Sequence, residues 1–338
     1  MIIVLKQQAS EAEIQQVLDR IESLGLTPTV SRGAERVVVG AIGDERKLAE
    51  GAFESMAAVE QVLPILKPYK LVSREFKATD TVIDVSGVPL GGNAVQIISG
   101  PCSVESQEQM DLSAKAVHEA GCRLMRGGAF KPRTSPYTFQ GLGDIGLDYF
   151  KNAASKYNLP IVTELMDVRK IDLFLEKGVD VIQIGTRNMQ NFDLLKEVGR
   201  LDVPIILKRG MSATIKDWLM AAEYIAAQGN QKIIFAERGI RTFETHYRNV
   251  LDVTAIPVLK KETHLPVIID PSHAGGKAWL VPALSRAAVA VGADGLLIET
   301  HPYPSEAWCD ADQALNPEQL KTLMKDLRAI AQILGRDL

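Results

Sequence analysis

Three cationic side chains lie close together in a segment, residues 124–137, whose backbone is shaped by two glycines and two prolines. Arg126, Lys131 and Arg133 fall within eight residues, directly after a short apolar run that is typical of a buried strand. Cations held at the end of a strand suit the capture of phosphate and carboxylate groups. A solvated charged loop is the alternative, but such loops rarely fix the backbone between their charges. We interpret the segment as an anion-binding site.

The elements that position these cations are predicted by a regular alternation of apolar and amphipathic segments. Amphipathic stretches with helix caps and glycine stops separate eight short apolar runs, and three of the runs directly follow a proline. This pattern indicates a parallel sheet covered by helices. The predicted strands are 95–99, 123–125, 161–163, 181–184, 205–207, 233–236, 267–269 and 296–298.

Eight such units predict a closed (β/α)8 TIM barrel, an α/β fold. A doubly wound open sheet is the competing architecture. It would usually carry a glycine-rich dinucleotide motif after its first strand, where this chain has Gly100-Pro-Cys-Ser103. The sequence contains no G-x-G-x-x-G motif, and Gly275-Gly-Lys277 lacks the other residues of a phosphate-binding P-loop.

Catalytic groups of such barrels lie where the strands end. Cations follow predicted strands two, four, five and six, and two carboxylates, Glu164 and Glu237, follow strands three and six. So many cations indicate substrates that together carry about three anionic groups. The cations are Arg126, Lys131, Arg133, Arg187, Lys208, Arg209 and Arg238.

A second group of side chains follows strands one, seven and eight, which are neighbours once the barrel closes. Cys102, His273, Glu299 and Asp310 can therefore converge, although they are far apart in the sequence. Sulfur, nitrogen and two oxygens suit one divalent ion of borderline softness, Mn, Fe, Co or Zn, acting as a Lewis acid on a carbonyl. A core thiol, a helix-capping histidine and ordinary surface acids are the alternatives. A Schiff base on Lys131 or Lys208 also stays open.

The first seventy residues predict a separate α+β domain with the order β-α-β-β-α-β of a ferredoxin-like unit. Its second helix is expected at residues 44–53. We predict domain boundaries at 1–66, a linker at 67–80 and the barrel at 81–338, opening with a β-hairpin that turns at Ser86-Gly87. The small domain is either a packing module or a regulatory one. Thr29, Ser31 and Gly33 give a weak indication of a polar ligand cleft.

Composition limits the remaining possibilities. The 338-residue chain is 46% hydrophobic and 24% charged, with a formal net charge of −4, which gives no general attraction to nucleic acid or anionic membranes. The apolar N-terminal run is too short for a signal peptide, and no run approaches membrane-spanning length. We therefore expect a cytoplasmic protein that binds neither nucleic acid nor membrane. Three cysteines argue against a disulfide framework.

Motifs along the whole chain resemble those of 3-deoxy-D-arabino-heptulosonate 7-phosphate (DAHP) synthase of the type I beta group, including its ferredoxin-like domain. The Lys-Pro-Arg-Thr run is absent from the related 3-deoxy-manno-octulosonate 8-phosphate synthase, which carries Ala-Asn-Arg there. The matching segments are Gly100-Pro-Cys-Ser103, Arg126-Gly-Gly-Ala-Phe-Lys-Pro-Arg-Thr-Ser135, Ile184-Gly-Thr-Arg-Asn188, Leu207-Lys-Arg-Gly210, Asp270-Pro-Ser-His273 and Glu299.

The resemblance implies a role for each of these residues. Erythrose 4-phosphate would be bound by Arg133, Thr134 and Ser135, and the metal by Cys102, His273, Glu299 and Asp310. Phosphoenolpyruvate would be bound by Arg126, Lys131, Arg187, Lys208 and Arg238, with Glu164 nearby.

The implied reaction is an aldol-like condensation without a Schiff base, in the first step of the shikimate pathway to aromatic amino acids. Glu164, Lys131, His273 and a water on the metal are all candidates for moving protons. The family also implies feedback inhibition by tyrosine or phenylalanine through the small domain, and a homotetramer. The octulosonate synthase, which uses arabinose 5-phosphate, and a non-catalytic amino-acid-binding barrel remain as alternative functions. A Cys102–Cys309 disulfide in the oxidised, metal-free protein is a further hypothesis.

Overall fold

The computed structural model describes residues 1–33, 36–43, 52–53, 55–63, 67–133 and 135–338. The chain forms two compact units. The first comprises Met1–Asp80 together with Lys261–His264, and the second comprises Thr81–Lys260 together with Leu265–Leu338.

The first unit contains an antiparallel sheet of four strands in the order β2-β3-β1-β4. Ser10 caps α1, and Glu13 completes a capping box with it. Apolar side chains of α1 pack on the sheet in a buried core. The elements are β1 (Ile2–Leu5), α1 (Glu11–Ser23), β2 (Thr27–Arg32), β3 (Val37–Ile42) and β4 (Val59–Leu63). Most of the helix predicted at 44–53 lies outside the described residues.

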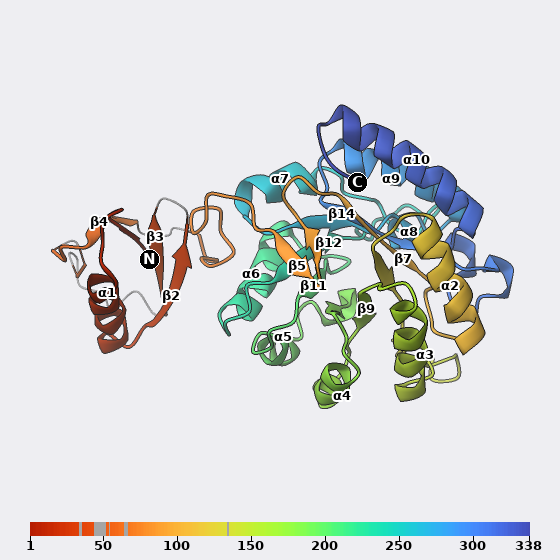
Figure 1. The fold of residues 1–338 in the computed structure, drawn as a ribbon, viewed down its shortest axis with the longest axis horizontal. Coiled ribbons are helices and arrows are strands. Elements are labelled where there is room, and N and C mark those ends of the chain that lie inside the picture. Colours follow the sequence, from red (N-terminus) through yellow and green to blue (C-terminus); the bar gives the residue numbers. More distant parts are fainter. Residues whose placement is uncertain (34–35, 44–51, 54, 64–66, 134) are drawn as a thin grey trace. The chain divides into compact units, whose positions relative to one another are not determined.

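The second unit is an eight-stranded closed barrel of parallel strands, ringed by helices (Figure 1). Strand β14 pairs with β7, so the last strand closes on the first as predicted. Each predicted strand is present, with ends that differ by at most one residue. The strands are β7 (Gln96–Gly100), β8 (Leu124–Arg126), β9 (Ile161–Glu164), β10 (Val181–Ile184), β11 (Ile205–Lys208), β12 (Ile233–Glu237), β13 (Val267–Ile269) and β14 (Gly295–Glu299).

Helices follow the barrel strands and supply the outer layer. Their starts are set by side-chain caps: Ser106 caps α2, Thr214 caps α6 and Asn316 caps α10. The helices are α2 (Gln107–Glu119), α3 (Asp144–Ser155), α4 (Ile171–Glu176), α5 (Phe192–Val198), α6 (Ile215–Ala226), α7 (Ala255–Glu262), α8 (Pro271–Gly275), α9 (Val281–Ala290) and α10 (Pro317–Ile333). Short 3-10 helices include η3 (Thr186–Asn188) in the loop after β10 and η6 (Ala311–Gln313) in the loop after β14.

A β-hairpin precedes the barrel and packs on the interior side chains of its strands. Strands β5 (Ile83–Val85) and β6 (Val88–Leu90) pair around the predicted turn at Ser86-Gly87. Their buried apolar residues join one cluster with interior residues of all eight barrel strands, such as Ile98, Leu124 and Leu297. The barrel interior is therefore a filled core on this side, and the chemistry is left to the carboxyl ends of the strands.

Candidate active site

A cavity of about 340 Å³ opens where the barrel strands end, and most of its charged lining is cationic. Its charged and imidazole side chains come from the ends of seven different barrel strands or from the loops that follow them, so only closure of the sheet brings them together. The lining cations are Arg126, Lys131, Arg133, Arg187, Lys208, Arg238, Arg241 and Arg248, and Glu164, His273 and Asp310 also line the cavity.

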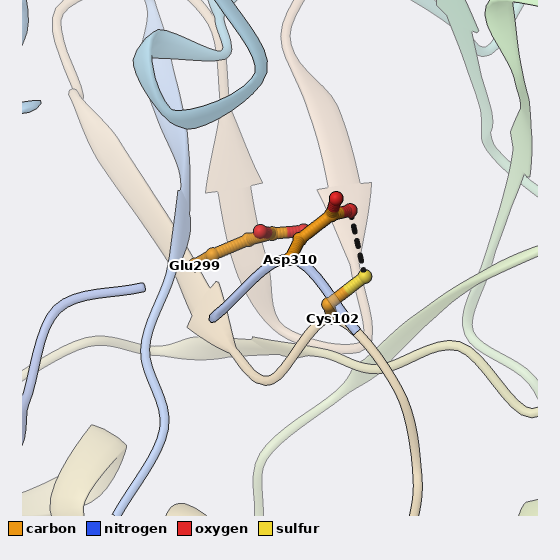
Figure 2. Close-up of side chains that lie close together, drawn as sticks. All are labelled: Cys102, Glu299 and Asp310. Carbon is orange, nitrogen blue, oxygen red and sulfur yellow. Dashed lines mark hydrogen bonds between the residues drawn. The ribbon is translucent and has the colours of Figure 1, made fainter. Parts of the chain in front are cut away.

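Three of the four predicted metal ligands meet at one point beside this cavity (Figure 2). The sulfur of Cys102 and one carboxylate oxygen each from Glu299 and Asp310 all lie within 4.8 Å of one another. Cys102 donates to Oδ2 of Asp310 across 3.2 Å. Cys102 follows β7, Glu299 ends β14 and Asp310 precedes η6, so each comes from one of two neighbouring strand ends.

His273 extends this group on α8, the short helix after β13. Its Nε2 lies 3.4 Å from Oε1 of Glu299 and 3.9 Å from Oδ2 of Asp310. Its Nδ1 lies 2.7 Å from Oδ2 of Asp270, the residue that caps α8. A carboxylate on one ring nitrogen fixes the orientation of an imidazole and leaves the other nitrogen free to bind a metal.

The electrostatics of this group favour a bound cation. Burial alone would raise the pKa of Asp310, but His273 and Arg248 lower it to about 2. Contact with Cys309, burial and the nearby Glu299 carboxylate raise the pKa of Cys102 well above that of a free thiol. Oε1 of Glu299 is buried and has no hydrogen-bond partner among the described residues. A buried carboxylate oxygen without a donor fits a metal ligand.

The cations nearest this group already have partners: Arg126 and Lys208 are buried in ion pairs, and Lys131 bonds to Cys102. Arg126 Nη2 lies 3.1 Å from Oε1 of Glu299, at ion-pair distance although it is not aligned for a hydrogen bond. Its Nη1 is buried without a hydrogen-bond partner within the described part of the chain, so it retains capacity for an anion. Lys131 donates to the carbonyl oxygen of Cys102 at 2.8 Å and lies 3.0 Å from its sulfur. Lys208 Nζ lies 2.5 Å from Oδ2 of Asp270.

The pKa values of the two lysines are shifted in opposite directions. Burial would lower the pKa of Lys131, but the adjacent Cys102 and Glu299 raise it above the ordinary value, so its side chain is an ammonium. Burial lowers the pKa of Lys208, and Arg126 adds to this, whereas Asp270 acts against it. Burial would also raise the pKa of Asp270, but His273 and Lys208 hold it well below the ordinary range.

Glu164 ends β9 and lies directly over Gly185 in the loop after β10. A Cβ atom added to Gly185 would come within 1.9 Å of Oε1 of Glu164. The glycine therefore leaves the space that the carboxylate occupies. Gln183 donates to the other oxygen at 3.4 Å. Arg187, two residues beyond Gly185, is exposed and lines the same cavity.

The residues predicted to bind erythrose 4-phosphate differ in their relation to the cavity. Arg133 lines the cavity, whereas Ser135 is not among the lining residues, and its hydroxyl accepts from the backbone nitrogen of Tyr137 at 3.3 Å. Thr134 lies outside the described residues. Arg133 also donates to the sulfur of Cys309 at 3.3 Å, and Cys309 is a free thiol in contact with Cys102.

Arg209 and Glu237, which the strand-end pattern also selected, do not line the cavity. Arg209 Nη1 lies 2.8 Å from Glu237 and 2.8 Å from Asp252, and the guanidinium lies 5.9 Å from the ring centre of Trp218. Because successive side chains of a strand point to opposite faces, Lys208 faces inward and Arg209 faces the helices.

Sequence reasoning missed two arginines and a glutamine. Arg248 donates to Gln313 at 2.9 Å and lies 3.4 Å from Asp310, and Gln313 donates to Oε2 of Glu299 at 2.5 Å. Arg241 lines the cavity nearby. Both arginines lie in the long loop after β12, where the sequence shows no strand end or motif to mark them. Asp270 belongs to one of the matching motif segments, but its pairing with both Lys208 and His273 was not predicted.

This fold and this site define a class: a (β/α)8-barrel enzyme with a cationic cavity beside a cluster of side chains that could hold a metal ion. Residues 77–334 match the DAHP synthetase I family, and residues 1–67 match the DAHP synthase ferredoxin-like domain. The chain belongs to the DAHP synthetase I family, and it is a transferase.

Individual relatives agree with this assignment. The chain is 50% identical over 335 residues to phospho-2-dehydro-3-deoxyheptonate aldolase of Thermotoga maritima, covering 99% of each chain. A crystal structure of that DAHP synthase superposes with a TM-score of 0.79 at 49% identity, covering 99% of this chain and 98% of the other. A 2-dehydro-3-deoxyphosphooctonate aldolase of Syntrophotalea carbinolica is 34% identical over 271 residues, which cover 74% of this chain and 96% of the relative.

Among the described residues, no helix has both the length and the apolar character needed to cross a membrane.

Proposed function

We propose that the chain is a metal-dependent DAHP synthase that condenses phosphoenolpyruvate with erythrose 4-phosphate and releases phosphate. The observation that carries this proposal is the arrangement of one cavity, with eight lining cations on its walls and Cys102, Glu299 and Asp310 converging beside it. The condensation needs both: cations for three anionic groups, and a group that polarises an aldehyde.

One divalent ion, Mn, Fe, Co or Zn, would be held by Cys102, His273, Glu299 and Asp310 and would supply Lewis-acid polarisation of the aldehyde carbonyl. The donor set fits such an ion because it combines sulfur, imidazole and carboxylate oxygens, and because the buried Oε1 of Glu299 has no hydrogen-bond partner among the described residues. Asp310 is ionised throughout the physiological pH range, since its pKa is about 2.

The cations of the cavity would bind and orient phosphoenolpyruvate. Arg126 has an unused Nη1, and Lys131 lies beside it as an ammonium. Lys208, Arg187 and Arg238 line the same cavity. Opposite charges at fixed positions hold the enol so that its C3 faces the aldehyde carbon of the second substrate.

The reaction then proceeds without a covalent enzyme intermediate. C3 of phosphoenolpyruvate forms a bond with the aldehyde carbon, water adds at C2, and the C2–O bond to phosphate breaks to leave a keto acid. Lys131 is a protonated group beside the cluster and is suited to give a proton to the new alkoxide. Glu164 lines the same cavity and is suited to accept the proton of the attacking water, because Asp270 and, in this proposal, the metal occupy the two ring nitrogens of His273.

Phosphate release from phosphoenolpyruvate tests this function. We expect release with erythrose 4-phosphate, little with arabinose 5-phosphate, and none after complete chelation. Preference for arabinose 5-phosphate would favour the octulosonate synthase, the activity named for the 34% identical relative. Full activity after chelation would contradict the metal assignment.

We further propose that the first unit binds tyrosine or phenylalanine and inhibits the barrel. Thr29 and Ser31 lie two residues apart on β2, an edge strand, and both are only partly buried. Gly33 follows in the turn to β3, where its nitrogen donates to Arg36. A truncated form of the Thermotoga maritima enzyme, matching 80% of this chain, has been solved, so a variant lacking residues 1–66 is a reasonable test. We expect that variant to lose inhibition by either amino acid.

We also expect a homotetramer, which light scattering of the full chain would test.

A further inference from the structure

A buried carboxylate outside the cavity links three segments of the chain. Glu105 lies in the loop between β7 and α2, and its side chain is 7% exposed. Oε1 accepts a hydrogen bond from the hydroxyl of Ser103 at 2.9 Å and another from the backbone nitrogen of Trp308 at 2.9 Å. Oε2 lies 3.3 Å from Nε2 of His301. One side chain therefore receives donors from the loop after β7 and from two points of the loop after β14.

Each of these three donors is adjacent to a proposed metal ligand. Ser103 follows Cys102 directly. His301 stands two residues after Glu299, and Trp308 stands two residues before Asp310. The ligand atoms of Cys102, Glu299 and Asp310 meet within 4.8 Å of one another. Glu105 thus ties together the three stretches of backbone whose relative position sets the spacing of sulfur and oxygens.

The proton positions require a carboxylate at this place. The backbone nitrogen of Tyr303 donates to Nδ1 of His301 at 3.0 Å, so the ring proton of the neutral imidazole lies on Nε2 and points to Glu105. Three donors then face two oxygens that can only accept. A glutamine would offer one acceptor oxygen, and its amide nitrogen would face a donor whichever way it turned.

The backbone of Glu105 is held as well. Its nitrogen donates to Oε1 of Gln109 at 3.3 Å, and Nε2 of Gln109 donates to the carbonyl oxygen of Ser103 at 3.1 Å. Gln109 lies in the first turn of α2 and is buried. The carboxylate is therefore anchored to a helix rather than to another loop, which makes it a fixed point for the three segments.

We propose that Glu105 is a positioning residue of the metal centre, and that His301 orients it. The inference rests on the metal site of the proposed function. Glu105 acts through Cys102, Glu299 and Asp310 and touches neither substrate nor ion. Partners that orient the ligands of a metal change its affinity by about 10- to 100-fold when they are removed. A carboxylate that served only to stabilise the loop would change the unfolding temperature and leave the affinity of the folded protein unchanged.

Cobalt binding tests the proposal without relying on turnover. The full-length apo protein is titrated with Co²⁺ while the thiolate-to-cobalt charge-transfer band and the visible ligand-field bands are recorded. The variants are Glu105→Gln and, as a matched control, Glu108→Gln. Glu108 lines the same surface pocket as Glu105 but is exposed and three residues further from Cys102. Near-ultraviolet circular dichroism shows which variants are folded.

We expect Glu105→Gln to bind Co²⁺ about 10- to 100-fold more weakly than the wild type, with altered ligand-field bands. Glu108→Gln should bind Co²⁺ with an affinity within about twofold of the wild-type affinity, because substitutions of exposed residues that make no buried contacts usually have small effects. A folded Glu105→Gln variant with wild-type affinity and spectrum would overturn the proposal.

A second pair of variants keeps the test decisive if Glu105→Gln does not fold. His301→Leu removes the donor to Oε2, whereas His301→Gln retains an amide N–H that can reach it. We expect weakened cobalt binding in His301→Leu and recovery in His301→Gln, and equal affinities in the two would overturn the proposal. A wild-type protein that showed no thiolate-to-cobalt band would instead contradict the metal site itself, so the two failures are distinguishable.

Discussion

Lys208 and Arg209 are consecutive residues at the end of β11, and both are buried in ion pairs, yet they belong to different regions of the barrel. Lys208 faces the cavity, where it pairs with Asp270, which also binds His273. Arg209 faces the helix layer, where Glu237 and Asp252 surround it. In the outward cluster of Arg209, Glu237 and Asp252, the cation is paired with carboxylates of the protein. The inward cluster of Lys208, Asp270 and His273 lies against an open cavity. The same residue types therefore serve stability on one face of the strand and chemistry on the other.

The largest expected effect tests the outward cluster. Arg209→Met leaves two carboxylates, Glu237 and Asp252, without their shared cation. Removing one partner of a buried ion pair costs about 3–5 kcal/mol of the free energy of unfolding. We expect a loss of this size in urea denaturation, with kcat/KM of the folded protein within a few-fold of wild type. A stable variant with impaired catalysis would reverse the roles that we assign to the two faces.

Lys208→Met makes the corresponding change on the inward face. Asp270 keeps His273 as a partner, so we expect a smaller loss of stability than in Arg209→Met. Removing a preorganised charge from a site where phosphate charge develops costs about 100- to 1,000-fold in rate. Steady-state phosphate release should show this loss in kcat/KM. Activity within tenfold of wild type would remove Lys208 from the substrate site.

His264, a buried histidine of the first unit that does not line the cavity, contributes to stability in a way that depends on pH. Nε2 of His264 lies 2.9 Å from the carbonyl oxygen of Leu71, and burial lowers the pKa of His264 from 6.5 to about 4. The unfolded chain therefore takes up a proton at a higher pH than the folded one. The stabilisation is complete above about pH 6.5 and is lost as the pH falls toward 4.

We expect this histidine to account for a loss of about 2 kcal/mol in the free energy of unfolding between pH 7 and pH 5. His264→Gln keeps a donor for Leu71 and cannot titrate, so its unfolding free energy should fall less over the same interval. Parallel pH profiles for the two proteins would show that His264 is not the titrating group.

The smallest expected effect concerns a residue that acts only by leaving space. Gly185→Ala would place Cβ within 1.9 Å of Oε1 of Glu164, and the flexible carboxylate would have to move. We expect about a tenfold loss of kcat/KM, as for a modest displacement of a positioned group, with little change in the unfolding temperature. If Gly185 acts through Glu164, adding Gly185→Ala to Glu164→Ala should cause no further loss. Additive losses in the double variant would assign Gly185 a separate role.

Much of the barrel and its site could be predicted because the signals are local. Apolar runs, three of them directly after a proline, predicted the barrel strands to within one residue at each end, and residues directly after a strand fall at the mouth of the barrel. His273, predicted as a ligand together with Cys102, places its Nε2 3.4 Å from Glu299 and 3.9 Å from Asp310, which meet Cys102 within 4.8 Å. Arg248 and Gln313 escaped prediction because their loops carry no periodic pattern.

The sequence by itself determined the class of fold, the boundaries of the strands and the kinds of group that would stand at their ends, because alternation and capping are encoded over a few neighbouring residues. Only the tertiary structure decided that Arg209 turns away from the cavity while Lys208 faces it, and that Arg248, Gln313 and Glu299 form one chain of contacts. Those outcomes depend on which side chains meet after the sheet has closed. Such contacts join parts of the chain that can lie more than two hundred residues apart in sequence, as Cys102 and Asp310 do.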